Sequence, residues 1–590
     1  MMSLPLFDPV SSWEAPKEPP NLDRVKLMAV DTETRDPRLL THGPGFARGE
    51  SFPVGTSIAT EDNAWYFPFW HPEDNCTWDV RRWLQEVFAV NRRYIFCNAM
   101  YDVGALSVID AIPQGEWTDI SVVQAIINEQ FVPGYSLDAM SRYWLGHGKD
   151  ETELNEALRT YGFKDKGGIA FLPARHVGQY ATVDAIRTYQ TYQAQWPHIE
   201  KDELTGVMEL EETILPLIWQ MIKRGINLDW DRAAMLYDQF ERESWKLRQD
   251  INTLGKMKID PGSSKSISRY CYANGIAYNM TEKGNPSIKG DWLAEAKDPV
   301  LRMIGRLRKL EKMMGFIESW QEYRGKDGRV HPQWLTTMAE DGGTRSGRFA
   351  SCDPNLQQVP IRDPEFGPLM RSLWLPEPGM LWGKLDVQSQ EIRIAVHYAH
   401  KARCTGAEAM VRAYQENPRL DFHQRVALMA GVDRNSAKTI SLGSLYGLGK
   451  KNLAVKLGFA RAHADSVYAQ YHEAVPFVSE LAQLASDAAM ERGYVKTYLG
   501  RKRRFMDHAY AHKALNSIVQ GTAADQMKTM MLRVLDELGL VPMITVHDEL
   551  GYSVESEEEL KQIAGIMENS LEFAVPMIVD CSVAQSWNQK

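Results

Sequence analysis

Apolar and polar residues alternate along residues 541–554, which predicts two short strands folded back on each other. The alternation breaks at the polar residues 547–549 and then resumes. A period of two is typical of half-buried strands, and a polar break between two such runs indicates a bend. We therefore expect Asp548 at the exposed tip of a hairpin, where a carboxylate stays ionised easily. Asp is also a common turn residue for local reasons, so this acid alone identifies no site.

Polar side chains also follow apolar runs in the first two hundred residues. Residues 25–34 and 94–106 are apolar runs that lead into acids, and residues 179–189 have the pattern of a helix. Asp31 and Glu33 share one face of the first strand, because side chains two apart point the same way. Two carboxylates on one face are unfavourable unless a cation binds between them. The other polar positions are Asn98, Asp102, Tyr180 and Asp184, the last two on one side of the helix.

The middle of the chain changes to helical periodicity. Residues 190–205 are polar, and we place a domain boundary there. The apolar spacing after residue 211 predicts a helix that stops at Gly225, and charged helical sequence continues to about residue 335. Residues 344–360 are rich in Gly, Pro and Asn and are expected to form mostly loop, with Arg345 and Arg348 exposed.

A second acid follows a strand pattern in the C-terminal half. The apolar run that begins at residue 381 ends at Asp386, and a helical pattern begins near Glu391. Asp386 and Asp548 each lie at a strand end or turn, so two strands of one sheet could bring them to a shared pair of metal ions. The alternative is two unrelated surface acids.

Residues 434–447 predict a helix with an unusual exposed stripe. The stripe consists of Arg434, Lys438, Leu442 and Tyr446, each four residues from the next. Steps of four drift by only about 40° around a helix, so the four side chains form one line. Two cations followed by an apolar and an aromatic residue suit a phosphate tail docked beside a flat ring. An ordinary amphipathic helix is the alternative.

Composition and charge limit the class of protein. The 590 residues, 44% of them hydrophobic and 24% charged, predict an ordinary globular chain of several domains without a membrane segment. Six scattered cysteines argue against a zinc site and a disulfide framework, and fit a reducing compartment. The formal net charge of −10 does not exclude nucleic acid, because phosphate contact needs only a local basic face. Two basic segments are candidates, with solvated basic faces as the alternative: Arg302, Arg306, Arg308, Lys309 and Lys312, and Arg501, Lys502, Arg503 and Arg504.

The N-terminal motifs, taken in order, resemble the three-motif signature of the DEDD exonuclease superfamily in its tyrosine subtype. Gln179 stands where the histidine subtype has His. The resemblance implies an RNase H-like α/β domain that digests a 3′ end. It also implies that Asp31, Glu33, Asp102 and Asp184 hold two divalent ions and that Tyr180 orients the attacking water. Hard oxygen ligands and paired ions suit phosphodiester hydrolysis.

The motifs of the second half are similar to those of family A DNA polymerases, the bacterial polymerase I and phage replicase group. They read TRSGRFASCDPNLQQVP, DVQSQEIR, RNSAKTISLGSLYG, HKALNSIVQGTAAD and VHDE. The resemblance covers nearly the whole chain, because such enzymes often carry a DEDD exonuclease in front. It implies an α/β multidomain fold, in which the RNase H-like exonuclease domain precedes a right-hand polymerase of thumb, palm and fingers.

The same resemblance implies roles for individual residues. Asp386 and Asp548 would hold two Mg²⁺ or Mn²⁺ ions of the palm. Glu549 and His547 would flank the primer terminus, and Glu391 would exclude a 2′-hydroxyl. Further implied contacts are Arg434, Lys438 and His423 on the triphosphate, Leu442 and Tyr446 beside the nucleotide, and Arg345, Arg348, Asn516 and Gln520 on the duplex. The implied partners are primer–template DNA and deoxynucleoside triphosphates, with processivity or replisome proteins as further candidates.

The predicted organisation follows these motifs. The predicted parts are a leader (1–24), the 3′–5′ exonuclease domain (25–200), the thumb and connecting helices (201–340), the palm in two parts (341–400 and 531–590) and the fingers (401–530). We predict a replicative phage DNA polymerase with 3′–5′ proofreading, in the cytoplasm of a bacterial or phage-infected cell. Two alternatives stay open: an exonuclease whose C-terminal part only grips nucleic acid, and a single-subunit RNA polymerase.

Overall fold

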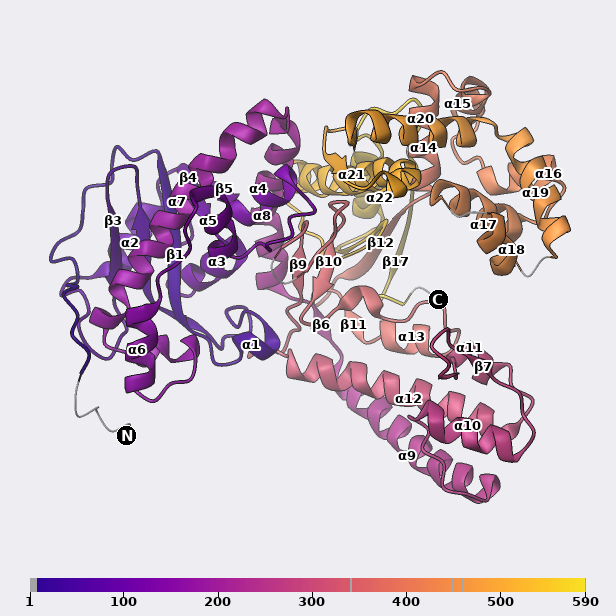
Figure 1. Cartoon of the computed structure of the whole chain (residues 1–590), viewed down its shortest axis with the longest axis horizontal. Coiled ribbons are helices and arrows are strands. Elements are labelled where there is room, and N and C mark those ends of the chain that lie inside the picture. The colour runs from indigo at the N-terminus through magenta and orange to yellow at the C-terminus, as the bar shows by residue number, and fades with distance from the viewer. Residues whose placement is uncertain (1–7, 340–341, 448–449, 458–459, 589–590) are drawn as a thin grey trace. The chain divides into compact units, whose positions relative to one another are not determined.

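The computed structural model describes residues 8–339, 342–447, 450–457 and 460–588 (Figure 1). It divides the chain into two compact units. The first contains Met1–Gly225, Pro332–Gln357 and Gly383–Val583, and the second contains Ile226–His331, Gln358–Trp382 and Ala584–Lys590. The finer domain limits given above stay predictions. No helix in the described part of the chain is both long and apolar enough to cross a membrane.

A five-stranded sheet organises the N-terminal part of the first unit. Its order is β3-β2-β1-β4-β5, with β1 antiparallel to β2 and parallel to β4. The strands are β1 (Leu27–Arg35), β2 (Phe52–Ala59), β3 (Ala64–Pro68), β4 (Arg92–Phe96) and β5 (Gly115–Asp119). Because β1 is the central strand and its apolar residues are buried, the acids that follow them on β1 lie deep in the domain.

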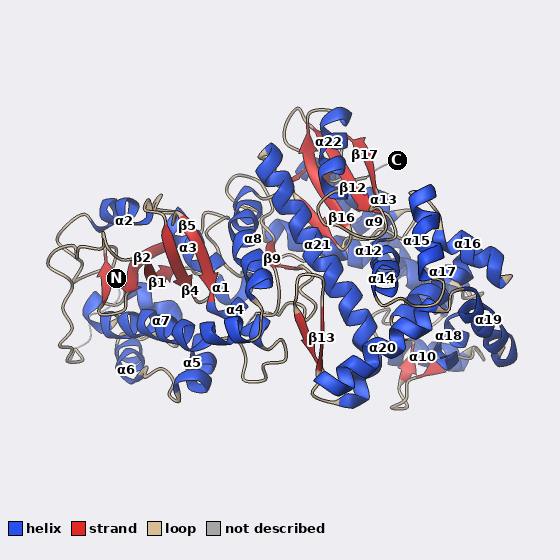
Figure 2. Cartoon of the chain, turned by 90° about the horizontal axis from the view of Figure 1, so that it is seen from above, coloured by secondary structure: helices blue, strands red, loops and turns tan. Residues whose placement is uncertain are grey.

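Helices lie on both sides of this sheet (Figure 2). The helices are α1 (Leu39–His42), α2 (Val80–Phe88), α3 (Ala99–Ser107), α4 (Ile120–Ile127), α5 (Leu137–Leu145), α6 (Thr152–Thr160), α7 (Gly178–Lys201) and α8 (Thr205–Arg224). Ala185 and Tyr189 of α7 pack on Ala29 of β1 and Ile95 of β4 in one buried cluster. Residues 190–201, where a domain boundary is predicted, continue α7, and a short connection leads to α8 within the same unit. That boundary stays a prediction. Gly225 ends α8, as predicted.

The remainder of the first unit contains a four-stranded sheet of order β15-β16-β12-β17 and many helices. The strands in this remaining part of the chain are β9 (Gln333–Leu335), β10 (Ala350–Cys352), β12 (Leu381–Val387), β13 (Tyr494–Lys496), β14 (Lys502–Arg504), β15 (Ile544–Val546), β16 (Glu549–Val554) and β17 (Val579–Ala584). Its helices are α14 (Gln390–Lys401), α15 (Ala407–Glu416), α16 (Phe422–Ala430), α17 (Arg434–Leu445), α18 (Lys450–Leu457), α19 (Arg461–Ala474), α20 (Phe477–Arg492), α21 (Ala514–Leu538) and α22 (Glu557–Glu568). The predicted hairpin of residues 541–554 is confirmed as β15 and β16.

The second unit is mostly helical, and its two long helices α9 and α12 pack along each other. Its elements are β6 (Asn227–Leu228), α9 (Trp230–Gly255), α10 (Ser264–Ala273), β7 (Asn279–Met280), β8 (Pro286–Ser287), α11 (Gly290–Ala294), α12 (Pro299–Glu322), α13 (Phe366–Arg371) and β11 (Trp374–Leu375). Ile251 of α9 and Ile304 of α12 belong to one buried apolar cluster. The helical periodicity predicted for this stretch is therefore confirmed.

The Asp119 side chain joins the first residues of two helices beside the N-terminal sheet. Its carboxylate accepts hydrogen bonds from the backbone N–H of Ser121 in α4 at 2.9 Å and of Ala99 in α3 at 2.8 Å. We expect Asp119→Ala to lower the free energy of unfolding of this domain by about 2–4 kcal/mol, since a cap is lost and buried donors lose their acceptor. Calorimetric unfolding of the full chain measures this. The exposed Asp62→Ala is the control, and an equal midpoint in both variants would contradict the prediction.

Candidate active sites

The predicted exonuclease residues line one cavity of about 420 Å³ in the first unit. Asp31 and Glu33 reach it from β1, because residues two apart share a strand face. Asp102 reaches it from the first turn of α3, which begins directly after β4. Tyr180 and Asp184 reach it from α7. The structure thus brings together all five predicted residues, which are far apart in sequence.

The four acids of this cavity are held in an environment that disfavours their charge. Burial and the charge of Asp184 raise the pKa of Asp31 to about 7. Burial and the charge of Asp31 raise the pKa of Glu33 and of Asp102 well above the usual range of a carboxyl. Each acid therefore makes its neighbours harder to ionise, so positive charge placed among them would be stabilising.

Two lysines that the sequence analysis missed also line the cavity. The Lys149 ammonium donates a hydrogen bond to Asp184 Oδ2 at 2.6 Å, and the Lys166 ammonium lies 3.3 Å from the Tyr180 hydroxyl. Both ammonium groups also lie over the Tyr180 ring, at 5.5 Å and 4.9 Å from its centroid. Neither lysine belongs to a periodic pattern, so only the folded chain reveals them.

The donor set of this cavity fits a hard divalent cation. Carboxylate oxygens are the preferred ligands of Mg²⁺ and Mn²⁺, and Asp184 Oδ1 is buried without a well-formed hydrogen bond. Among the described residues, no three His, Cys, Asp or Glu side chains already converge at metal-binding geometry. Asp102 accepts two hydrogen bonds from Thr32, at 2.9 Å and 2.7 Å, and Asp184 is paired with Lys149.

The second predicted pair of acids lies on adjacent strands of the four-stranded sheet. Asp386 belongs to β12, and Asp548 lies in the bend between β15 and β16. The backbone N–H of Val387 donates to the Asp548 carbonyl oxygen at 3.1 Å, so the two acids are neighbours across the sheet. The pairing of β12 with β16 therefore joins two motifs that are distant in sequence.

The expectation that Asp548 occupies an exposed tip is wrong. Asp548 is half-buried, because its bend pairs with β12 through the hydrogen bond from Val387, and burial raises the pKa of its carboxyl. Burial and the charge of Asp548 raise the pKa of Asp386 to about 6. Nearby, the buried Glu549 is paired with Lys384 of β12 at 3.3 Å. Both catalytic candidates thus resist ionisation in the absence of a cation.

Two predicted residues from different segments contact Glu391, at the start of α14. Arg348 donates to Glu391 Oε1 at 2.5 Å, and the Tyr446 hydroxyl donates to Oε2 at 2.6 Å. His547 lies in the bend beside Asp548 with a φ of +59°, and its side chain is exposed. A small pocket lined by Arg348, His547 and residues of α21 lies beside this cluster.

The predicted stripe on residues 434–446 is confirmed as one face of α17 and its C-cap. Arg434, Lys438 and Tyr446 are exposed, and Leu442 is half-buried. Arg434 also donates to Asp421 Oδ2 at 2.6 Å. His423 of α16 is buried, and this burial lowers its pKa to about 4, so its ring is neutral at pH 7.

The predicted duplex contacts lie on two segments. Asn516 and Gln520 lie one turn apart on α21, and both are half-buried. Asn516 Oδ1 is buried without a hydrogen-bond partner among the described residues. Arg345 is exposed in the loop before β10. The predicted loop around residues 344–360 contains only the short β10 and one turn of 3₁₀ helix.

Several residues of the two basic segments form ion pairs with acids from distant segments, whereas Arg302 and Lys312 of α12 are exposed. In α12, Arg306 pairs with Glu243 at 2.7 Å and also with Glu365, and Lys309 pairs with Asp363. Just before β14, Arg501 is buried against Glu211 and Asp525. In β14 itself, Lys502 contacts Asp202. The next two residues, Arg503 and Arg504, both contact Glu129. Charge alone could not reveal these partners, which come from distant segments.

Comparison with known proteins identifies the family. The model of DNA polymerase family A matches residues 231–589. The DNA-directed DNA polymerase of Pseudomonas phage M6 is 31% identical, over 99% of this chain and 97% of its own length. The DNA polymerase DpoZ of Acinetobacter phage SH-Ab 15497 is 26% identical, over 96% of this chain and 98% of its own length. The fold is similar to that of the POL domain of Pol1 from M. smegmatis, solved with DNA primer-template and dNTP, with a TM-score of 0.78, 20% identity and 96% of each chain covered.

The raised pKa of Asp386 predicts a pH-dependent stability of the metal-free protein. The folded state binds a proton at Asp386 more tightly than the unfolded state, so this group favours folding at acidic pH, and the benefit is lost as pH rises through about 6. We therefore expect Asp386→Asn to raise the thermal midpoint at pH 7.5 and to change it little at pH 4.5, in buffer with EDTA. An equal shift at both pH values would contradict the electrostatic explanation.

Proposed function

Because the chain belongs to DNA polymerase family A, we propose that Asp386 and Asp548 are the catalytic carboxylates of its DNA synthesis. The family membership makes the chain a DNA-directed DNA polymerase and decides against the alternative of an RNA polymerase or an exonuclease alone. The observation that carries the assignment is the pairing of β12 with the β15–β16 bend, which brings these two half-buried acids together. Primer–template DNA and deoxynucleoside triphosphates are the proposed partners.

Family A polymerases generally use divalent metal ions. Asp386 and Asp548 supply the hard oxygen donors for two Mg²⁺ or Mn²⁺ ions, which when bound would neutralise the charge that develops on the reacting phosphate. The half-buried acids support this assignment, because their raised pKa values indicate a place where positive charge is stabilising. Glu549 and His547 are proposed to flank the primer terminus beside them.

The exposed face of α17 is the proposed nucleotide site. Arg434 and Lys438 present two cations one turn apart, which suits the binding of a triphosphate. Leu442 and Tyr446 continue the same face with apolar and aromatic surface for the base or sugar. His423 is neutral and buried beside these cations, so it would act as a hydrogen-bonding group and not as a third positive charge.

The cluster at Glu391 is proposed to control sugar choice and duplex contact. Glu391 already accepts hydrogen bonds from Arg348 and Tyr446, so its carboxylate is fixed by two donors. A fixed carboxylate under the sugar would leave no space or partner for a 2′-hydroxyl. Arg345, Arg348, Asn516 and Gln520 are proposed to contact the nascent duplex through its shape and its backbone, which fixes position without reading sequence.

The proposed reaction transfers a nucleotidyl group to the primer. The primer 3′ oxygen loses its proton and attacks the α-phosphorus, which forms a new P–O bond. The bond between the α-phosphorus and the bridging oxygen breaks, and pyrophosphate leaves with the electron pair. The chain contributes mainly by positioning the two reactants and by stabilising the charge of the leaving phosphates through Arg434 and Lys438.

The four acids and Tyr180 that line the N-terminal cavity support a second proposed activity, a 3′–5′ exonuclease. Asp31, Glu33, Asp102 and Asp184 are proposed to hold two divalent ions, for which the buried, poorly hydrogen-bonded Asp184 oxygen is a fitting ligand. Tyr180 is proposed to orient a water molecule toward the terminal phosphodiester. The water oxygen would form a bond to phosphorus, the bond to the penultimate 3′ oxygen would break, and a nucleoside 5′-monophosphate would leave.

Removal of one palm acid tests the synthetic site. We expect Asp548→Ala to lower primer extension by a factor on the order of 1000, because one of the two carboxylates is lost. Extension of a labelled primer–template with Mg²⁺ measures this, and digestion of single-stranded DNA by the same sample confirms that the protein is folded. The exposed Asp536→Ala of α21 is the matched control. Extension at the wild-type rate by Asp548→Ala would exclude the proposed site.

Removal of two cavity acids tests the exonuclease. We expect Asp31→Ala with Glu33→Ala to abolish degradation of a labelled 3′ end and to leave primer extension intact, since the two sites use different acids. The exposed pair Glu18→Ala with Asp23→Ala is the control. Loss of extension in the double variant would show that the two activities are not separable, and undiminished degradation would place the exonuclease elsewhere.

A further inference from the structure

The cavity that contains the four acids has a second wall, and that wall comes from the polymerase part of the chain. Residues 334–339, which include β9 strand residues, line the cavity together with Leu215 and Ile218 of α8. Met338 also packs against the buried cluster of the N-terminal sheet. The segment leads toward Arg345 and Arg348, so the wall and the proposed duplex contacts are parts of one hairpin region.

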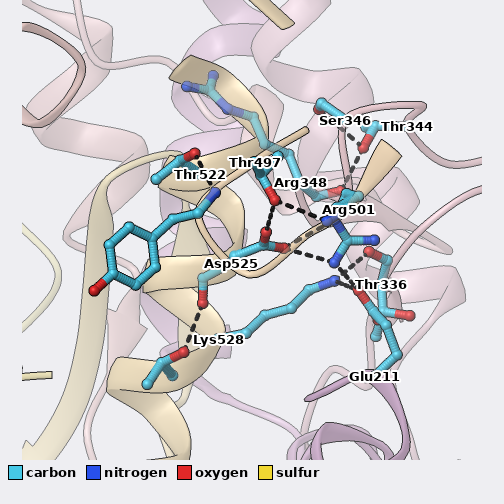
Figure 3. A network of polar contacts seen from close by, with 12 residues as sticks. Glu211, Thr336, Thr344, Ser346, Arg348, Thr497, Arg501, Thr522, Asp525 and Lys528 are labelled. Carbon is cyan, nitrogen blue, oxygen red and sulfur yellow. Dashed lines mark hydrogen bonds and ion pairs between the residues drawn. The ribbon is translucent and has the colours of Figure 1, made fainter. Parts of the chain in front are cut away.

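A buried network of charges holds this wall in place (Figure 3). The Lys528 ammonium donates to the Thr336 carbonyl oxygen at 2.7 Å and also pairs with Glu211 of α8. Glu211 accepts a second hydrogen bond from Arg501 at 2.5 Å. The side chains of Lys528 and Glu211 are 0% exposed, so neither can exchange its partner for water.

The other half of the network is anchored in α21 and in the loop before β14. Asp525 accepts two hydrogen bonds from Arg501, at 2.8 Å and 2.7 Å, and one from Thr497 at 2.6 Å. Two cations and two anions therefore balance one another in the protein interior. Asp525 and Lys528 lie on the same helix as Asn516 and Gln520. The position of the cavity wall is thus tied to the helix that carries proposed duplex contacts.

We propose that residues 335–339 form the surface that receives the 3′-terminal nucleotides of DNA in the exonuclease cavity, and that Lys528 is a positioning residue that fixes this surface through Thr336. The inference rests on the proposed exonuclease function and names the part of the cavity that holds its substrate. The lining of the cavity includes the acids and also an apolar and hydroxyl-bearing set of residues, namely Leu335, Thr336, Thr337 and Met338. Such a surface suits an unpaired base and sugar, whereas the acids and the lysines suit the phosphate.

A comparison of two substrates separates this role from metal binding and from folding. A short single-stranded oligonucleotide needs both the acids and the wall, whereas bis(4-nitrophenyl) phosphate presents one phosphodiester with neither a base nor a sugar. For Lys528→Met we expect KM for the oligonucleotide to rise roughly tenfold, since its 3′ end is no longer held in place. We expect hydrolysis of the small diester to change less than about twofold. Lys561→Met, on the exposed face of α22, is the control and should match the wild type.

Two variants keep the test decisive. Circular dichroism shows whether Lys528→Met folds, because loss of one buried charge destabilises its partners. If it does not fold, Met338→Ala removes part of the wall directly and must show the same difference between substrates. Unchanged oligonucleotide kinetics in the folded variant would overturn the inference, and so would an equal loss on both substrates. If the wild-type protein hydrolyses neither substrate, the proposed exonuclease itself fails.

Discussion

The repulsion between carboxylates that the fold forces together in a partly dry environment is the constraint on which both candidate sites depend. Burial and the neighbouring acids raise the pKa of Asp31 and of Asp386, so each site favours the arrival of positive charge. In the N-terminal cavity, Lys149 supplies some of that charge by pairing with Asp184. The fold therefore holds acids in places that are stabilised when cations bind, and phosphoryl-transfer chemistry requires such cations.

Balance of charge distinguishes these sites from the structural ion pairs of the same unit. Glu211 and Asp525 are as deeply buried as any catalytic candidate, but Arg501 and Lys528 neutralise them within hydrogen-bonding distance. That network pairs each acid with a cation and joins α8 to α21. The catalytic candidates instead outnumber their cationic partners. An excess of buried acid over buried base is thus the physical signal that marks a site, more than the presence of charge itself.

The sequence predicts those parts of the fold and of the candidate sites that depend on the pattern of neighbouring residues. The hairpin of β15 and β16, the strand that ends near Asp386 and the stripe on α17 each follow from periodicity over a few residues. The exposure of Asp548 could not be predicted, because it depends on the pairing of β12 with a segment distant in sequence. The lysines of the N-terminal cavity and the wall at residues 334–339 could not be predicted either, because they also reach the site through contacts between segments distant in sequence. Likewise, the sequence could not show that the basic residues at 501–504 form ion pairs with Glu129, Glu211 and Asp525.

The central claim is that this DNA polymerase has two separate carboxylate centres for divalent ions, one built from β12 and the β15–β16 bend and one from β1, α3 and α7. The most direct measurement is anomalous diffraction from crystals of the full chain grown with Mn²⁺, primer–template DNA and a non-hydrolysable nucleotide. We expect anomalous density beside Asp386 and Asp548 and, separately, among Asp31, Glu33, Asp102 and Asp184. Density that is absent beside Asp386 and Asp548 while the nucleotide is bound would contradict it.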